Sequence, residues 1–199
     1  NHPVVGVSWK QARAFATWRS KVFTGYTNKI INPYIAKLPM DLPTEAQWTY
    51  ACQMTHPTKT KPTKNPHDFN FKQGEGTYNV DGSTYTNHVM AYEPNAAGLY
   101  NMPGNVSEWT MDAYREGAKA FVHDLNPVMV YDAKDDEPLI MQQKVVKGGS
   151  WKDAAIFSDP TIRVSETQNS GRSYIGFRCV MPAPELNLTV TSLQPSVKE

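Results

Sequence analysis

Apolar residues at helical spacing occur in two segments near the start of the chain. In the first segment, Ser8 and Gln11 have the pattern of a capping box, in which each side chain bonds the other's backbone N–H. The apolar residues that follow at helical spacing are Ala12, Phe15, Ala16 and Trp18. The pattern predicts a helix from Ser8 to about Val22, with these side chains on its buried face.

The second segment repeats this arrangement. Thr44 and Gln47 form another capping-box pattern, and the apolar positions run on through Ala51. Trp48 and Cys52 lie four residues apart, so they share one face of the predicted helix. We therefore expect Cys52 to point at the core.

The composition of two long stretches indicates insertions without regular secondary structure. Residues 54–77 begin polar, basic and proline-rich, which is typical of a surface loop. Residues 116–142 form a second insertion, which is acidic from Asp132 to Glu137. The lysines of the first insertion and the aspartates of the second are expected to be solvated, or to meet across a subunit contact.

Strand-like patterns are short and lie late in the chain. Residues 144–147 and 175–181 are predicted strands. Beyond Met181 a proline-rich tail interrupts the pattern, and residues 186–190 alternate like an edge strand. With 15 prolines and 12 glycines among 199 residues, the chain should contain many turns and modest regular structure.

The composition indicates one globular domain without an evident charged partner. Hydrophobic residues make up 40% of the chain, and 20 basic residues balance 19 acidic ones. The net charge of +1 gives no reason to expect nucleic acid or an anionic membrane as a partner. No apolar run is long enough to span a bilayer. The chain starts inside an apolar segment, and we expect it to be a fragment or a processed product.

The two cysteines leave two interpretations open. Cys52 and Cys179 are compatible with one disulfide, and equally with two buried free thiols.

Four blocks occur in a characteristic order. They are Pro3–Trp9, Leu42–Ala51, Gly98–Thr110, and Gly148–Trp151 followed by Arg163 and Gly176–Cys179. Together they resemble the formylglycine-generating-enzyme (sulfatase-modifying-factor) family. The resemblance implies an irregular α+β fold of low secondary-structure content, related to C-type lectins. It covers residues 1–183, without the family's usual N-terminal part, and leaves 184–199 as an extended C-terminal tail.

The same resemblance bears on the cysteines. In that family the positions of Cys52 and Cys179 can be bridged, which implies a disulfide here if the compartment is oxidising. A bridge closing so long a loop would add about 4 kcal/mol to stability, less any strain.

The resemblance also bears on chemistry. The family oxidises a substrate cysteine through two active-site thiols that bind Cu(I), and Asp153 and Ser158 occupy the matching positions. Oxygen ligands are hard and do not suit Cu(I), nor do they form a mixed disulfide. A related iron-dependent sulfoxide synthase uses clustered histidines, and the five histidines here show no such spacing. We therefore expect no catalytic residues, no copper and no iron, and so not an enzyme.

A structural metal is a separate expectation. Side-chain oxygens of Asn101 and Glu108, with the carbonyls of Gly104 and Val106, would suit a hard cation, and the resemblance places calcium on this loop. The alternative is a turn in which Asn101 and Glu108 cap local N–H groups.

Several segments resemble a particular branch, the GldK/PorK (or GldJ) lipoproteins of gliding motility and type IX secretion. These segments are Phe121–Pro127, Tyr131–Lys134, Lys147–Asp153 and Ser173–Arg178. The resemblance implies a non-catalytic structural subunit of a protein-transport ring in the periplasm, homo-oligomeric and joined to a partner protein. It would be held at the outer membrane by a lipid anchor that this chain lacks. The alternatives are a lectin-like carbohydrate-binding module and a divergent metal-dependent oxidase of the formylglycine type.

The tryptophans complete the expected core. Trp9, Trp18, Trp48, Trp109 and Trp151 lie in or near the blocks, and most are expected to pack inside.

Overall fold

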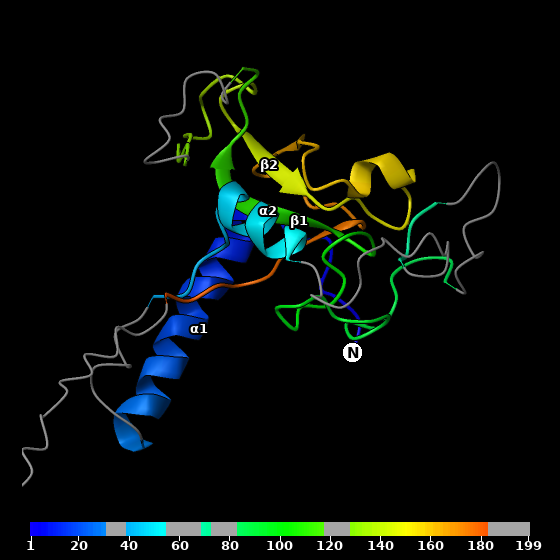
Figure 1. Cartoon of the computed structure of the whole chain (residues 1–199). Helices are drawn as coiled ribbons and strands as arrows, with labels where there is room; N and C mark the ends of the chain where they lie inside the picture. Colours follow the sequence, from blue (N-terminus) through cyan, green and yellow to red (C-terminus); the bar gives the residue numbers. More distant parts are fainter. Residues whose placement is uncertain (31–38, 55–68, 73–82, 118–127, 183–199) are drawn as a thin grey trace, which may run out of the picture.

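A computed structural model describes residues 1–30, 39–54, 69–72, 83–117 and 128–182. Its helices are α1 (Trp9–Ile30), α2 (Glu45–Gln53) and the 3-10 helix η3 (Ala155–Ser158). Its strands are β1 (Ser107–Ala113), β2 (Gln143–Lys147), β3 (Val164–Thr167) and β4 (Ile175–Gly176). Few helices around one small mixed sheet confirm the expected α+β class (Figure 1).

The four strands form one sheet in the order β3-β2-β1-β4. β2 pairs antiparallel with both β1 and β3, whereas the two-residue β4 runs parallel to β1. A bulge between Trp109 and Ala113 shifts the β1–β2 register. β1 therefore lies inside the sheet, between β2 and β4.

 Six of the seven β1 residues are themselves buried, and Met111 is the partly exposed one.

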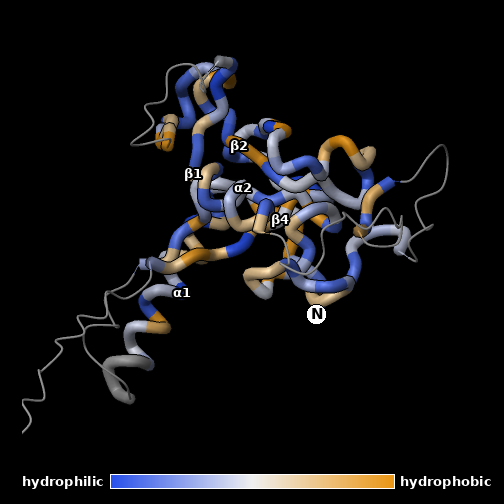
Figure 2. The backbone as a smooth tube through the Cα atoms, viewed as in Figure 1, coloured by the Kyte–Doolittle hydropathy of each residue, from blue (hydrophilic) through white to orange (hydrophobic). Residues whose placement is uncertain are grey.

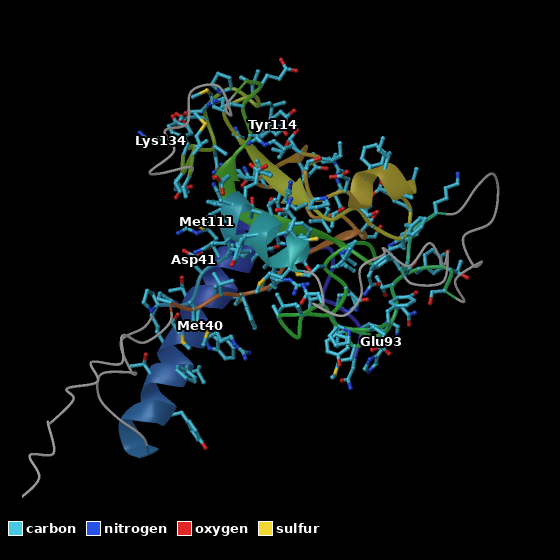
Figure 3. All side chains as sticks on the ribbon, in the orientation of Figure 1. Met40, Asp41, Glu93, Met111, Tyr114 and Lys134 are labelled. Atoms are coloured by element: carbon cyan, nitrogen blue, oxygen red, sulfur yellow. The ribbon has the colours of Figure 1, made fainter. Side chains whose placement is uncertain are left out.

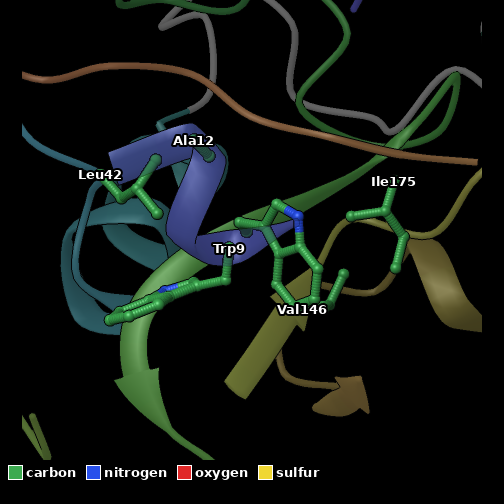
Figure 4. Close-up of a cluster of buried hydrophobic side chains, with 6 residues drawn as sticks. Trp9, Ala12, Leu42, Val146 and Ile175 are labelled. Carbon is green, nitrogen blue, oxygen red and sulfur yellow. The ribbon is translucent and has the colours of Figure 1, made fainter. Parts of the chain in front are cut away.

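The hydrophobic core lies where the first turn of α1 meets the middle of the sheet (Figure 4). Its buried members are Trp9, Ala12, Leu42, Trp109, Val146 and Ile175. Two indole N–H groups lock the entry segment onto β1, because Trp9 donates to the Thr110 carbonyl (2.8 Å) and Trp109 donates to the Val7 carbonyl (3.0 Å). Each tryptophan therefore fills the core and satisfies its one polar atom there.

The predicted capping box of α1 is confirmed. The Ser8 N–H donates to Gln11 Oε1 at 2.9 Å, and the Gln11 N–H donates to Ser8 Oγ at 3.2 Å. The helix is longer than predicted and continues to Ile30, because the first proline after Ser8 is Pro33 and one internal glycine costs only about 1 kcal/mol.

The distal half of α1 projects from the body of the molecule (Figure 1). The expectation that Trp18 is buried is wrong, since 56% of it is exposed. The buried face runs through Trp9, Ala12 and Ala16, and Trp18 lies off that line.

Hydropathy alternates along this helix (Figure 2), and no helix among the described ranges is both long and apolar enough to cross a membrane.

α2 and the late strands follow the sequence pattern in part. The Thr44–Gln47 capping box is present and Trp48 is buried, while Cys52 is half-buried. The strand predicted at 144–147 is confirmed as β2, but that predicted at 175–181 shortens to β4 and an isolated bridge from Val180 to Asp41. The chain leaves the sheet after Gly176, where an added Cβ would lie 2.6 Å from the Val4 carbonyl oxygen.

Several predicted segments fall wholly or mostly outside the described residues. These are the basic loop 54–77, the first half of the 116–142 insertion and the C-terminal tail 184–199. In the described half of the insertion, Asp135 and Asp132 pair with Lys10 (2.5 Å) and Arg13 (3.9 Å) of α1. Two of the acidic residues therefore have partners within their own chain.

Lys144 of β2 is fully buried although it carries an ammonium group. Its Nζ lies 3.9 Å from the centre of the Trp9 ring and donates to the Tyr131 carbonyl. The aromatic face and the carbonyl compensate for lost water, but burial still lowers the pKa of Lys144 to about 8.

Gly148, the first residue after β2, has no room for a side chain. Gly148 has a φ of +94°, and a Cβ there would lie 2.8 Å from the Met102 carbonyl oxygen and 2.9 Å from the Trp48 ring. We predict that Gly148→Ala lowers the free energy of unfolding by about 3 kcal/mol, from strain and overlap together. Equilibrium unfolding in urea measures this loss of stability.

The matched control is Gly98→Ala. Gly98 also has a positive φ, of +74°, but nothing lies within 4 Å of an added Cβ. Only the backbone cost of about 1 kcal/mol should appear there. Equal losses for the two variants would contradict the packing argument.

Lys144 makes stability depend on pH in a defined direction. Between pH 8 and 10.5 the unfolded chain holds a proton that the folded chain has released, so the free energy of unfolding should rise with pH by up to about 1.4 kcal/mol per unit. Lys144→Met removes this rise. The difference between wild type and variant isolates it from the raised pKa of Cys52, which both proteins share. A difference that stays constant from pH 7.5 to 10.5 would refute the assignment.

Candidate functional site

The turn that follows β2 carries the two positions at which the family's thiols were expected. Gly148 and Gly149 both adopt positive φ angles, which sends the chain sharply out of the sheet. A Cβ on Gly149 would lie 2.9 Å from the Phe157 backbone, so η3 packs directly on this glycine. Asp153 and Ser158 therefore sit on one compact turn that folds back over the glycine pair.

Asp153 is held from two sides. One carboxylate oxygen accepts a hydrogen bond from Ser150 Oγ at 2.6 Å, and the other lies 2.6 Å from Lys152 Nζ. The carbonyl of Asp153 also accepts the Lys72 N–H at 2.9 Å. The carboxylate is thus oriented by a hydroxyl and neutralised by an ammonium group.

Ser158 is used differently. Its hydroxyl donates to the Ala155 carbonyl at 2.5 Å, within the turn of η3. A hollow of about 230 Å³ lies beside Asp153, and Ser158 is not among the residues that line it. The structure therefore assigns Asp153 to the hollow and Ser158 to a local backbone contact.

The walls of this hollow include polar groups that the sequence did not single out. Lys152 Nζ lies 4.1 Å from the centre of the Tyr174 ring, a cation–π contact. Glu166 of β3 and Ser107 of β1 also line it. These residues come from four separate segments, so no spacing in the sequence could have joined them. The contacting species at the Asp153 position are oxygens and an ammonium group, not sulfur.

Glu108 makes contacts that do not fit the calcium site expected at Asn101, Gly104, Val106 and Glu108. Its carboxylate accepts from both Arg178 Nε (2.6 Å) and Nη2 (2.7 Å), and from the Trp48 indole (2.7 Å). An arginine already supplies the positive charge there. Asn101 donates its amide to the His88 and Val89 carbonyls. Calcium stays a prediction that these contacts do not favour.

No cluster of metal-binding side chains occurs within the described ranges. His2 and His88 lie there, and each bonds a local or neighbouring group, Thr86 Oγ1 and the Met90 N–H respectively. His56, His67 and His123 lie outside the described residues.

The expected disulfide is not formed in the structure, in which Cys52 and Cys179 are free and half-buried. Burial raises the pKa of Cys52 to about 11, and Glu108 adds to this effect. Burial also raises the pKa of Cys179. Both groups are therefore thiols near neutral pH, and a thiol binds metal and attacks far less readily than a thiolate.

A larger cavity of about 670 Å³ is lined in part by the Glu108–Arg178 pair. Its walls come from the entry segment, from α1 and from the loop before β1, and include Val7, Phe15 and Tyr100. Cys179 and Arg19 line the same cavity. It is mostly apolar around one buried ion pair, a composition that is typical of ligand or peptide pockets.

Comparison with known proteins identifies the family. The model of the sulfatase-modifying factor enzyme 1-like domain matches residues 1–183. The formylglycine-generating enzymes of Mus musculus and Thermomonospora curvata are 32% and 33% identical to this chain, over 90% of its length and 44% and 55% of theirs. The inactive Cα-formylglycine-generating enzyme 2 of Bos taurus is 31% identical over 91% of the chain and 50% of its own length.

Solved structures agree on the fold. PvdO from Pseudomonas aeruginosa superposes with a TM-score of 0.67 at 20% identity, covering 91% of this chain and 62% of that one. Treponema denticola variable protein 1 gives a TM-score of 0.60 at 23% identity, with 89% and 70% covered. The chain spans about half the length of the curated relatives that it matches.

These relatives correct one expectation. The chain was expected not to be an enzyme because oxygens replace the thiol pair, but the relatives named formylglycine-generating enzymes suggest an enzyme. Oxygen atoms at two positions disfavour Cu(I) there, but they do not rule out other chemistry in the domain. Members named inactive in cattle and mouse show that the family holds both kinds.

The ligand chemistry of the turn is directly testable. We predict that the double variant Asp153→Cys/Ser158→Cys binds Cu(I) at least tenfold more tightly than wild type, because soft thiolates replace hard oxygens. Competition against a chromogenic Cu(I) chelator measures the affinity. Asp153→Ser, which adds no thiol, is the control and should match wild type. Equal affinity of wild type and the double variant would contradict this account of the turn.

Proposed function

Because this chain belongs to the sulfatase-modifying factor enzyme 1-like family, and because parts of it resemble the GldK/PorK lipoproteins, we propose that it is a subunit of a protein-secretion ring of the type IX kind. In this proposal the protein works at the periplasmic face of the outer membrane, in multiple copies and with a partner protein. The proposal concerns assembly, and it is independent of whether the domain also carries out chemistry.

The observation that carries the proposal is the convergence of the GldK/PorK-like segments. Segment 147–153 supplies Lys152 and Asp153 to the hollow of about 230 Å³, and segment 173–178 supplies Tyr174. The cation–π contact between Lys152 and Tyr174 joins the two segments directly. Residues that carry the resemblance thus form one structural unit, beside the positions at which the sequence resemblance predicts the family's thiol pair.

A third segment, 131–134, lies in the acidic insertion. The Ala133 carbonyl accepts the buried Gln168 amide at 2.7 Å, which ties the insertion to the turn after β3. The fourth segment, 121–127, lies outside the described residues. Three of the four segments are therefore fixed to the same sheet by contacts of their own.

A second candidate function is favoured by the names of the relatives. It is oxidation of a cysteine in a polypeptide to formylglycine, the activity in the names of the mouse and Thermomonospora curvata proteins. This candidate needs a metal ligand set other than two thiolates at Asp153 and Ser158. Incubating the protein with a cysteine peptide, oxygen and Cu(I), and following the peptide mass, tests it.

The ring proposal predicts a defined phenotype. Deleting the gene for this protein from its bacterium should abolish the release of proteins that the secretion machine exports. Complementation with the intact gene should restore their release. Protein tagged at its native level should then sediment with the outer membrane in an assembly of many copies, which cryo-electron tomography should show as a ring.

A deletion strain that secretes normally, with the tagged protein monomeric in the periplasm, would refute the ring proposal. The matched control is a complementing copy carrying Glu93→Lys, a charge reversal on an exposed residue in the loop before β1, which should secrete as wild type does (Figure 3).

A further inference from the structure

α1 carries an exposed apolar stripe on the half of the helix that projects from the body (Figure 1). Trp18, Val22 and Tyr26 follow one another at spacings of four residues, so they share one face. Their exposed fractions are 56%, 51% and 61%. These residues line a hollow of about 280 Å³ with Arg19 and Phe23, all of them from α1 itself.

The charged residues of α1 itself have one sign. α1 contains no acidic residue, and Arg19 and Lys21 are exposed on its projecting half. Each lies three residues from a member of the stripe, Arg19 from Val22 and Lys21 from Trp18. The projecting half of α1 is therefore an apolar strip with a basic border.

The acidic insertion carries the complementary surface. Three of its apolar residues are exposed: Leu139 (68%), Ile140 (70%) and Val130 (53%). The same insertion carries the acidic run from Asp135 to Glu137, in which Asp135 pairs with Lys10 of its own chain and Asp136 is exposed. Lys134 marks this insertion near the end of the molecule opposite the tip of α1 (Figure 3). The insertion is therefore an apolar tip with an acidic border.

We propose that the α1 stripe of one copy packs against the insertion tip of a second copy of this chain. The occupant is a second copy because one molecule carries both complementary surfaces, apolar against apolar and basic against acidic, at separate ends. When one copy binds another through two different surfaces, the pair still has one free stripe and one free tip. Further copies can therefore add head to tail, and the chain of copies closes into a ring where the rotation between neighbours allows. The inference deepens the ring proposal and rests on it.

Two variants separate the faces. Trp18→Ser/Val22→Ser removes the apolar stripe, and Leu139→Ser/Ile140→Ser removes the apolar tip. Because all four side chains are exposed, we expect both variants to fold. Sedimentation velocity over a range of concentrations should show wild type associating and each variant weakened at least tenfold, because apolar anchors dominate such contacts. Ile156→Ser, at a residue 67% exposed on η3, is the control and should associate as wild type does.

Mixing the two variants gives the decisive result. The stripe variant retains its tip and the tip variant retains its stripe, so an equimolar mixture should form dimers and nothing larger. A mixture that stays monomeric, or a wild type that is monomeric at every concentration, overturns the proposal.

Charge distinguishes this contact from a symmetric pairing of two α1 helices. Arg19→Gln/Lys21→Gln should weaken association if the basic border meets the acidic tip, and the loss should shrink as salt is raised. The same change would strengthen a symmetric α1 pair by relieving like-charge repulsion, and that outcome overturns the proposal. If the faces associate as described but their variants secrete cargo normally, the contact stands and the ring function fails.

Discussion

The structure depends on one buried carboxylate. Glu108 lies in β1, is 5% exposed, and binds the Trp48 indole of α2 together with two guanidinium nitrogens of Arg178, which follows β4. A charge buried this deeply is tolerated only when it is paired and fully hydrogen-bonded, so these three segments must arrive together. The same pair lines the cavity of about 670 Å³.

The position of the glycine turn follows from that arrangement. With Trp48 fixed by Glu108, its ring leaves no room for a side chain at Gly148, and the chain leaves β2 in a left-handed conformation. The turn then brings Asp153 to Ser150 and Lys152, beside Tyr174. At this turn the described side chains present oxygen and nitrogen groups, which do not suit Cu(I). Fold alone does not decide which activity such a turn serves.

The two ends of the molecule differ from this satisfied centre. The centre pairs its buried charges, as Glu45 does with Arg163 at 2.8 Å, whereas the tip of α1 and the acidic insertion expose aromatic and aliphatic side chains. Exposed apolar surface with a charged border is a common feature of protein interfaces. The buried charges are therefore concentrated at the centre of the molecule, and both of its ends carry exposed apolar side chains.

The sequence by itself determined the local features: both capping boxes, the β2 strand, the α+β class and the family blocks, because helix caps and alternating strands depend on neighbours along the chain. The assignment of Asp153 and Ser158 to the family's thiol positions stays a prediction from the sequence. Tertiary structure decided that Trp18 faces solvent and that Glu108 pairs with Arg178, 70 residues away. It also joined Lys152 to Tyr174 beside Asp153. Such partners are set by long-range packing, which no spacing along the chain records.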